Sequence, residues 1–269
     1  MNILIKKSIP NFITLSNLFL GFTSIILLSL SLYKDSYIST ACYLILISCG
    51  LDTIDGKIAR RLNISSEFGK EIDSMADLVS FCIVPSLLLF IHYIKVIPSE
   101  ENNLILLILL SSIPLILGAI RLAKYNALRE MRESQKYLGL PTPANAILVC
   151  SMILFVHNIP FRMLVNDSIF YQFLSTIFLD YQWMILNVAI VSSILLMSKV
   201  NYDKFPLISF KINRRNTFDL IKVMLFLIIL FIFIYFYYYD LVLLLFIMVY
   251  IFGNLIKYIF KKLLKKIRK

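Results

Sequence analysis

The chain has 269 residues, of which 59% are hydrophobic and only 16% are charged. A soluble domain is usually about 45–50% apolar and about 25% charged, so this composition excludes an ordinary soluble protein and predicts lipid-facing helices. The formal net charge of +11 does not indicate nucleic-acid binding, because the basic residues gather in loops between apolar runs, where they mark membrane topology.

Eight apolar runs are long enough, at about 20 residues each, to cross a bilayer as helices. The first run is too long for the hydrophobic core of a cleaved signal peptide and is predicted to be a span. The segment 163–181 is too polar for a span, and we expect it on the outer face, where an interfacial helix is one option. The predicted spans cover residues 12–32, 37–56, 72–93, 104–123, 143–160, 182–198, 218–238 and 241–260.

Basic residues concentrate in every second connection between these spans. The connection after the second span, for example, contains Lys57, Arg60, Arg61 and Lys70, whereas the connection after the first contains only Lys34. Positively charged loops stay in the cytoplasm, so both chain termini are predicted to be cytoplasmic. The expected fold class is an all-α, polytopic membrane bundle.

The C-terminal segment from Ile256 repeats apolar residues at helical spacing, with lysines on its other face. Two interpretations stay open: a basic amphipathic helix on the anionic inner leaflet, or the frayed basic end of the last span. The cysteines lie inside apolar runs without zinc-site spacing, so we expect packing residues and no disulfide framework. They are Cys42, Cys49, Cys82 and Cys150.

Four aspartates flank the connection between the second and third spans. Asp52 and Asp55 are three residues apart at the end of one span, and Asp73 and Asp77 are four residues apart at the start of the next, so each pair shares a helix face. Two antiparallel helices can point these faces at each other. Converging carboxylates repel, and a hard divalent cation such as Mg²⁺ or Mn²⁺ relieves that repulsion, often sharing its ligand shell with a substrate phosphate.

Small and basic residues accompany these acids. Gly56 and Ala59 leave room for a ligand to approach the helix that carries Asp52 and Asp55, and Arg60 can pair with a phosphate. Gly69 is expected to end the loop and let the chain turn into the third span.

Together these residues read Asp-x2-Asp-Gly-x2-Ala-Arg-x8-Gly-x3-Asp-x3-Asp. This pattern resembles the signature of the CDP-alcohol phosphatidyltransferase family at every specified position. The resemblance implies a six-helix membrane core, a homodimer, and transfer of a phosphatidyl-type group from a CDP-linked donor to an alcohol. It covers roughly residues 8–211, so we expect a family domain over 1–211 and a C-terminal two-span hairpin with the basic tail over 212–269.

The resemblance also implies a role for each matching residue. Asp77 matches the proposed general base. The implied ligands of the divalent metal are Asp52, Asp55, Asp73 and Asp77. The positions implied to contact the CDP moiety are Asp52, Gly56, Ala59, Arg60 and Gly69.

Segments outside the signature resemble the serine-using branch of the family, the bacterial integral-membrane phosphatidylserine synthases. Leu78 follows the last aspartate, where the glycerol-phosphate-using relatives usually carry lysine. The branch implies CDP-diacylglycerol and L-serine as substrates and a lipid-embedded enzyme of the bacterial cytoplasmic (inner) membrane with its active site on the cytoplasmic side. The segments that carry this resemblance are 73–81, 121–126, 139–144 and, near the N-terminus, Pro10, Asn11, Thr14, Asn17, Gly21 and Phe22.

A serine site needs partners for an ammonium and a carboxylate. Arg121, at the cytoplasmic end of the fourth span, can meet the carboxylate; the alternative is a charge that fixes topology. Asn17, inside the first span, can hydrogen-bond the substrate; the alternative is a helix–helix hydrogen bond.

Two rival functions remain open on the sequence. One is a related phosphatidyltransferase that uses glycerol 3-phosphate or another polyol. The other is a membrane transporter, but the chain lacks the paired interrupted helices of many transporters, and all four acids of the motif lie at one surface.

Overall fold

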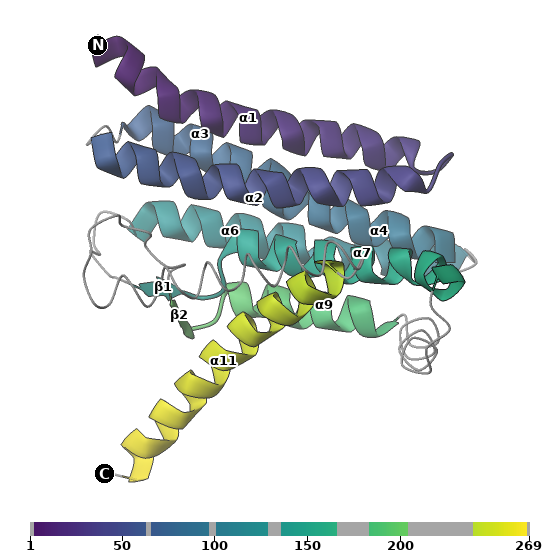
Figure 1. Ribbon diagram of the computed structural model, residues 1–269. Coiled ribbons are helices and arrows are strands. Elements are labelled where there is room, and N and C mark those ends of the chain that lie inside the picture. The colour runs from purple at the N-terminus through teal and green to yellow at the C-terminus, as the bar shows by residue number, and fades with distance from the viewer. Residues whose placement is uncertain are drawn as a thin grey trace.

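The computed structural model of the chain describes residues 3–62, 66–96, 101–128, 136–165, 183–203 and 239–267. These residues form a helical bundle in which most helices run alongside one another (Figure 1). The predicted all-α membrane bundle is therefore confirmed. The helices are α1 (Ile3–Leu30), α2 (Ser36–Leu62), α3 (Glu67–Asp77), the π-helix η1 (Leu78–Ile83), α4 (Val84–Val96), α5 (Glu101–Ser111), α6 (Ile113–Leu128), α7 (Thr142–Val165), α9 (Trp183–Leu196) and α11 (Tyr239–Ile267).

Six stretches of the described chain are helical, long and apolar enough to cross a membrane, and each coincides with a predicted span. The predicted span 182–198 corresponds to the shorter apolar helix α9. The predicted span 218–238 lies outside the described residues, as does the segment 163–181 apart from the last turn of α7. The six stretches are Ile9–Leu30, Ser36–Ile58, Glu67–Val96, Leu104–Ala127, Thr142–Ile159 and Tyr239–Leu264.

Two prolines interrupt the regular helices. Pro85 has no N–H to donate, and its ring would clash with the carbonyl of Phe81 in a regular α-helix. The preceding turn is the wider η1, in which the Val84 N–H bonds to the Val79 carbonyl, five residues back. Pro114 lies at the break between α5 and α6, where the Ser86 hydroxyl of α4 accepts the Leu115 N–H at 2.9 Å.

One face of α1 is small and polar and faces the bundle. Thr14, Asn17, Gly21 and Ser24 are all buried, at alternating spacings of three and four residues. Small and hydroxyl residues let membrane helices approach closely and hydrogen-bond, and α1 packs along α2 and α3. Large apolar side chains cover the opposite face and are exposed as lipid-facing residues would be: Phe12, Leu15, Phe19, Phe22 and Ile26.

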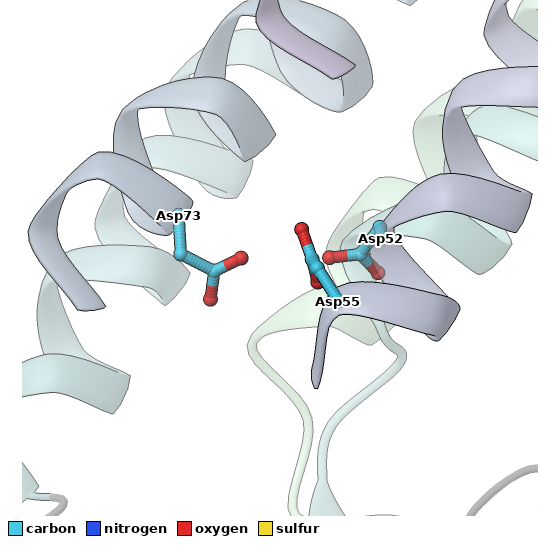
Figure 2. A group of neighbouring side chains, drawn as sticks. All are labelled: Asp52, Asp55 and Asp73. Atoms are coloured by element: carbon cyan, nitrogen blue, oxygen red, sulfur yellow. The ribbon is translucent and has the colours of Figure 1, made fainter. Parts of the chain in front are cut away.

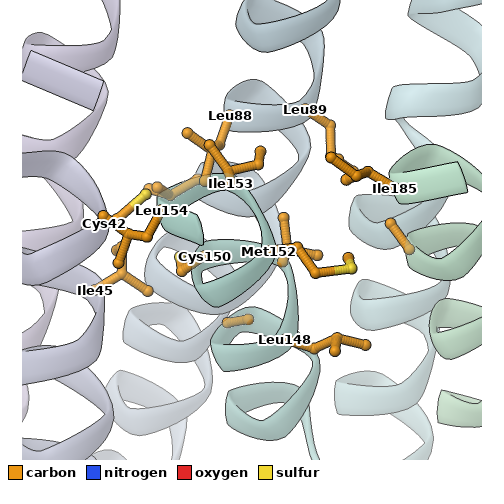
Figure 3. Close-up of a cluster of buried hydrophobic side chains, with 14 of the residues drawn as sticks. Cys42, Ile45, Leu88, Leu89, Leu148, Cys150, Met152, Ile153, Leu154 and Ile185 are labelled. Carbon is orange, nitrogen blue, oxygen red and sulfur yellow. The ribbon is translucent and has the colours of Figure 1, made fainter. Parts of the chain in front are cut away.

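The hydrophobic core surrounds α7, whose span is 78% buried, against 28% for α1. Figure 3 shows buried α7 side chains such as Leu154 and Ile153 in one cluster with residues from α2, α4 and α9. The four cysteines are buried and form no disulfide bonds, as predicted for packing residues. Cys42 and Cys150 lie within this cluster.

A short strand pair was not predicted from the sequence. Strand β1 (Lys136–Leu138) pairs antiparallel with β2 (Asn201–Asp203), with Tyr137 opposite Tyr202. Gly139 follows β1 with a φ of +77°, and a side chain there would overlap the carbonyl of Leu196. Only glycine fits this position without strain, so the turn fixes where α7 begins relative to α9.

Helix α11 crosses the bundle obliquely and packs against α7 and β2 (Figure 1). Its first turn is held by a buried acid: Asp240 accepts hydrogen bonds from Asn158 Nδ2 at 3.0 Å and from the Leu241 N–H at 2.9 Å. Tyr239 beside it contacts the hydroxyl of Tyr43 on α2. The basic tail is part of the same helix, which continues to Ile267.

Candidate active site

Three of the four aspartates converge where α2 and α3 face each other (Figure 2). Asp52 and Asp55 come from α2 and Asp73 from α3, and one ligand atom from each lies within 4.8 Å of the others. The spacing of the motif predicted this convergence. Asp55 is buried, whereas Asp52 and Asp73 are half-buried, so the group is partly accessible from outside the bundle.

Asp77 lies one helical turn further along the chain than Asp73, at the junction of α3 and η1. It does not belong to the three-residue cluster, but it interacts electrostatically with Asp52, Asp73 and Arg121. Its Oδ1 atom is buried and has no hydrogen-bond partner in the part of the chain that the structure describes. A buried acceptor without a partner is costly, which makes Asp77 available to a ligand.

The start of α3 sets the position of Asp73. Ser66 caps the helix, because its Oγ accepts the Gly69 N–H at 3.0 Å and replaces a missing backbone acceptor of the first turn. The expectation that Gly69 ends the loop is wrong, since the helix begins at Glu67 and Gly69 lies in its first turn. A Cβ at Gly69 would lie 3.1 Å from Asn11 Oδ1 and from Ser66 Oγ, so glycine allows the close approach of α1 and α3.

Thr14 of α1 donates a side-chain hydrogen bond to Asp55. Its hydroxyl lies 2.7 Å from Asp55 Oδ2 and 3.0 Å from the carbonyl of Pro10. The sequence resemblance included Thr14 but gave no role to it. The contact joins residues 41 positions apart, so no local spacing pattern could have found it.

Asn17 lies one turn further along α1 and ties three helices together. Its backbone carbonyl accepts hydroxyl hydrogen bonds from Ser80 of η1 at 3.1 Å and from Ser48 of α2 at 3.2 Å. Its Oδ1 accepts from Ser48 at 2.5 Å. The structure therefore shows the helix–helix role that the sequence left open. The buried Nδ2 has no partner among the described residues and could still donate to a substrate.

Arg121 enters the same region from α6. It is 9% exposed, and its Nη1 donates to Thr142 Oγ1, at the start of α7, over 3.4 Å. Its charge acts on Asp77. A nearby contact joins α6 to α3, where Asn126 Nδ2 donates to Ser74 Oγ at 2.8 Å. The segments 73–81 and 121–126, which both carry the resemblance to the serine-using branch, thus meet beside the carboxylates.

The remaining predicted site residues lie on α2 beyond Asp55. Gly56 follows Asp55 directly and is half-buried. Ala59 and Arg60 lie within the helix, but their side chains are outside the described part of the chain. Their predicted contacts with a CDP moiety stay predictions.

A profile of the CDP-alcohol phosphatidyltransferase family matches residues 7–195. The chain belongs to the CDP-alcohol phosphatidyltransferase family. The matched region contains the whole aspartate motif and ends within α9. Family membership counts against the transporter alternative and makes the chain a membrane-embedded transferase.

Similar curated proteins in this family bear the names of serine-using enzymes. The CDP-diacylglycerol–serine O-phosphatidyltransferase of Helicobacter pylori is 29% identical over 219 residues, which covers 81% of this chain and 79% of that protein. The enzyme of the same name from Methanocaldococcus jannaschii is 30% identical over 200 residues, covering 74% and 75%. An archaetidylserine synthase from Methanothermobacter thermautotrophicus is 31% identical over 150 residues, covering 55% and 58%.

The donor set of this phosphatidyltransferase fits a hard divalent cation. Carboxylate oxygens are the ligands that Mg²⁺ and Mn²⁺ prefer. Oxygens around an octahedral Mg²⁺ at 2.0–2.1 Å are separated by about 3 Å when adjacent and about 4 Å when opposite. The atoms of Asp52, Asp55 and Asp73, within 4.8 Å of one another, need only small side-chain rotations to reach that spacing.

Proposed function

We propose that this chain transfers the phosphatidyl group of CDP-diacylglycerol to the hydroxyl of L-serine, giving phosphatidylserine and CMP. The observation that carries the proposal is the aspartate motif, with three carboxylates in contact range, in a family member whose relatives are named as serine O-phosphatidyltransferases. The glycerol 3-phosphate alternative has no comparable support among these relatives.

In the proposed reaction the serine hydroxyl oxygen attacks the phosphorus of the phosphatidyl group. A new P–O bond to serine forms, the P–O bond to CMP breaks, and the hydroxyl proton passes to a base. Asp77 is the proposed base, because its carboxylate lies beside the cluster and its buried Oδ1 has no hydrogen-bond partner among the described residues. A positioned base of this kind contributes about 10²–10⁴-fold to the rate.

Asp52, Asp55, Asp73 and Asp77 are the proposed ligands of Mg²⁺ or Mn²⁺. The bound cation would neutralise the pyrophosphate of the donor and stabilise the charge on departing CMP. The protein holds the carboxylates near each other on α2 and α3, both of which pack against α1, so little reorganisation is needed when the donor binds. We assign contact with the CDP moiety to Asp52, Gly56, Ala59, Arg60 and Gly69.

Arg121 is the proposed partner of the serine carboxylate. It is buried, it lies beside Asp77, and its contact with Thr142 orients it. Serine is zwitterionic, and one cation suffices for its carboxylate, whereas a phosphate monoester carries about two negative charges at pH 7 and would need more. Asn17 is the second proposed serine contact, through its buried Nδ2.

The proposed setting is a bacterial cytoplasmic membrane with both termini and the carboxylate site on the cytoplasmic side. It is supported by the distribution of basic loops and by the site's place near the connection between α2 and α3. We further propose a homodimer, a family domain over 1–211 and a C-terminal unit over 212–269 whose helix α11 rests on α7.

The test supplies purified protein with CDP-diacylglycerol and Mn²⁺, and offers labelled serine and labelled glycerol 3-phosphate in parallel. We expect label from serine in the lipid product and release of CMP in equal amount. Label that enters lipid only from glycerol 3-phosphate would overturn the choice of alcohol, and label from neither would overturn the proposed transfer.

A further inference from the structure

The hydrogen bond between Thr14 and Asp55 has features that a packing contact alone does not require. Thr14 is 4% exposed and Asp55 3% exposed, so the bond is shielded from water, where hydrogen bonds to charged groups are strongest. The Thr14 hydroxyl has a single proton and two acceptors within reach, at 2.7 Å in Asp55 and 3.0 Å in Pro10. The shorter distance, to the carboxylate, identifies Asp55 as the preferred acceptor.

The bond occupies one oxygen of Asp55. A carboxylate rotates about its Cα–Cβ and Cβ–Cγ bonds, and fixing Oδ2 against α1 removes that freedom. The Asp55 carboxylate then keeps a set orientation beside Asp52 and Asp73, with one oxygen of each residue within 4.8 Å of the others (Figure 2). Residues that orient a metal ligand in this way typically change metal affinity or activity 10–100-fold when removed.

We propose that Thr14 is a positioning residue for the cation site: its hydroxyl locks Asp55 in the rotamer that binds Mg²⁺ or Mn²⁺. The inference rests on the proposed function, since it assumes that the aspartates hold a cation. It extends the site to α1, which contributes no carboxylate, and it makes cation affinity sensitive to how α1 packs against α2.

A second threonine of the same helix provides a matched control. Thr23 donates to the carbonyl of Phe19 at 2.8 Å, four residues back, just as Thr14 reaches Pro10. Its hydrogen bond is exposed and lies two turns away from the carboxylates. Substituting valine at either position removes a hydroxyl and its bond to the i−4 carbonyl while keeping the β-branched shape, but only Thr14→Val also removes a buried contact with Asp55.

The experiment measures Mn²⁺ binding to the full-length detergent-solubilised protein by electron paramagnetic resonance, without either substrate. Thr14→Val is expected to raise the Kd for Mn²⁺ 10–100-fold. Thr14→Ser, which keeps the hydroxyl, and Thr23→Val should stay within about threefold of the original protein. Thermal unfolding in excess chelator, where no cation contributes, should give similar midpoints for Thr14→Val and Thr23→Val.

An unchanged Kd for Thr14→Val would overturn the positioning role, and so would an equal weakening in Thr23→Val. If Thr14→Val also unfolds at a much lower temperature in chelator, Thr14→Ser decides, because a purely structural hydroxyl predicts no selective rescue of Mn²⁺ affinity. Failure of the original protein to bind Mn²⁺ would instead overturn the cation site itself, and with it the proposed function.

Discussion

Buried or half-buried acids occur at two opposite ends of the bundle, and their surroundings differ. Asp240, at the start of α11, accepts hydrogen bonds from the neutral amide of Asn158 and from a backbone N–H. At the other end, Asp52, Asp55 and Asp73 have one another as close neighbours, and Asp77 adds a fourth charge. The first arrangement is complete within the protein, whereas the second gathers like charges that repel.

The difference distinguishes an acid that stabilises the fold from a set of acids that performs chemistry. A buried carboxylate with neutral donors fixes the packing of two helices and needs nothing more. A cluster of carboxylates costs stability unless a cation joins it, and such a cost is retained where the cluster performs chemistry. The two ends should therefore respond in opposite ways to substitution: one in stability, the other in turnover.

The largest expected effect is on turnover at the cluster. Asp77→Asn keeps the shape of the side chain but cannot accept the serine proton, so kcat should fall about 10²–10⁴-fold. Donor binding should change far less, because Asp52, Asp55 and Asp73 remain as carboxylate ligands for the cation. Asp240→Asn, measured beside it, should keep its kcat. Steady-state kinetics with labelled serine checks both variants, and near-normal turnover in Asp77→Asn would show that another group is the base.

The second effect is on stability at the opposite end. Asn158→Leu removes a side-chain hydrogen bond to the buried Asp240 and should cost about 1–3 kcal/mol of unfolding free energy, with kcat unchanged below the unfolding temperature. Asn187→Leu is the control, because Asn187 is exposed. Thermal unfolding in detergent measures the difference. Equal midpoints for the two variants would mean that Asp240 does not anchor α11.

The third effect concerns the π-helix beside Asp77. A Cβ at Gly21 would overlap the Ser80 hydroxyl and lie 3.2 Å from its Cα, so Gly21→Ala should push η1 away from α1. Overpacking of this kind costs about 1–3 kcal/mol, and kcat should fall as Asp77 shifts. Gly50→Ala, where nothing lies within 4 Å, should be neutral or stabilising by up to about 1 kcal/mol. Activity and melting curves of both variants test the comparison.

The smallest effect is expected from an exposed ion pair at the Asp240 end. Lys95 donates to Asp35 at 2.5 Å, and this hydrogen bond holds the pKa of Asp35 below its usual value. A lowered pKa stabilises the fold above the unfolded pKa of about 3.9, and the contribution disappears as the pH falls through the folded pKa.

Asp35→Asn should therefore cost less than about 1 kcal/mol at pH 7, since exposed pairs contribute little, and still less at pH 2, where more of Asp35 is protonated. Melting temperatures of the two proteins at both pH values provide the measurement. A larger difference at the acidic pH would contradict the sign of the shift.

Local patterns in the sequence predicted the spans and the convergence of the aspartates, because helix period and span length are local properties. The positions of Asp52, Asp55 and Asp73 on facing helices follow directly from their spacing. The contacts that complete each end of the molecule are not local: Thr14 meets Asp55 across 41 positions, and Asn158 meets Asp240 across 82. No periodicity encodes such pairs.

The sequence patterns also did not predict where the backbone departs from regular α-helix. The interruptions at Pro85 and Pro114 were not predicted, because whether a proline produces a kink, a break or a π-turn depends on neighbouring helices, such as α4, whose Ser86 hydroxyl accepts the Leu115 N–H. The strand pair after Lys136 depends on residues more than 60 positions apart. The prediction that Gly69 ends the loop was wrong because Ser66 caps α3, so the helix begins before the apolar run.

The most direct test of a cation-dependent transfer to serine is removal and return of the metal. Purified protein is treated with excess EDTA, dialysed, and assayed for phosphatidylserine formation from CDP-diacylglycerol and labelled serine, with and without added Mn²⁺ or Mg²⁺. We predict that turnover disappears on chelation and returns with either cation. Full turnover in excess chelator would contradict the assignment of the Asp52, Asp55, Asp73 and Asp77 carboxylates as a metal site.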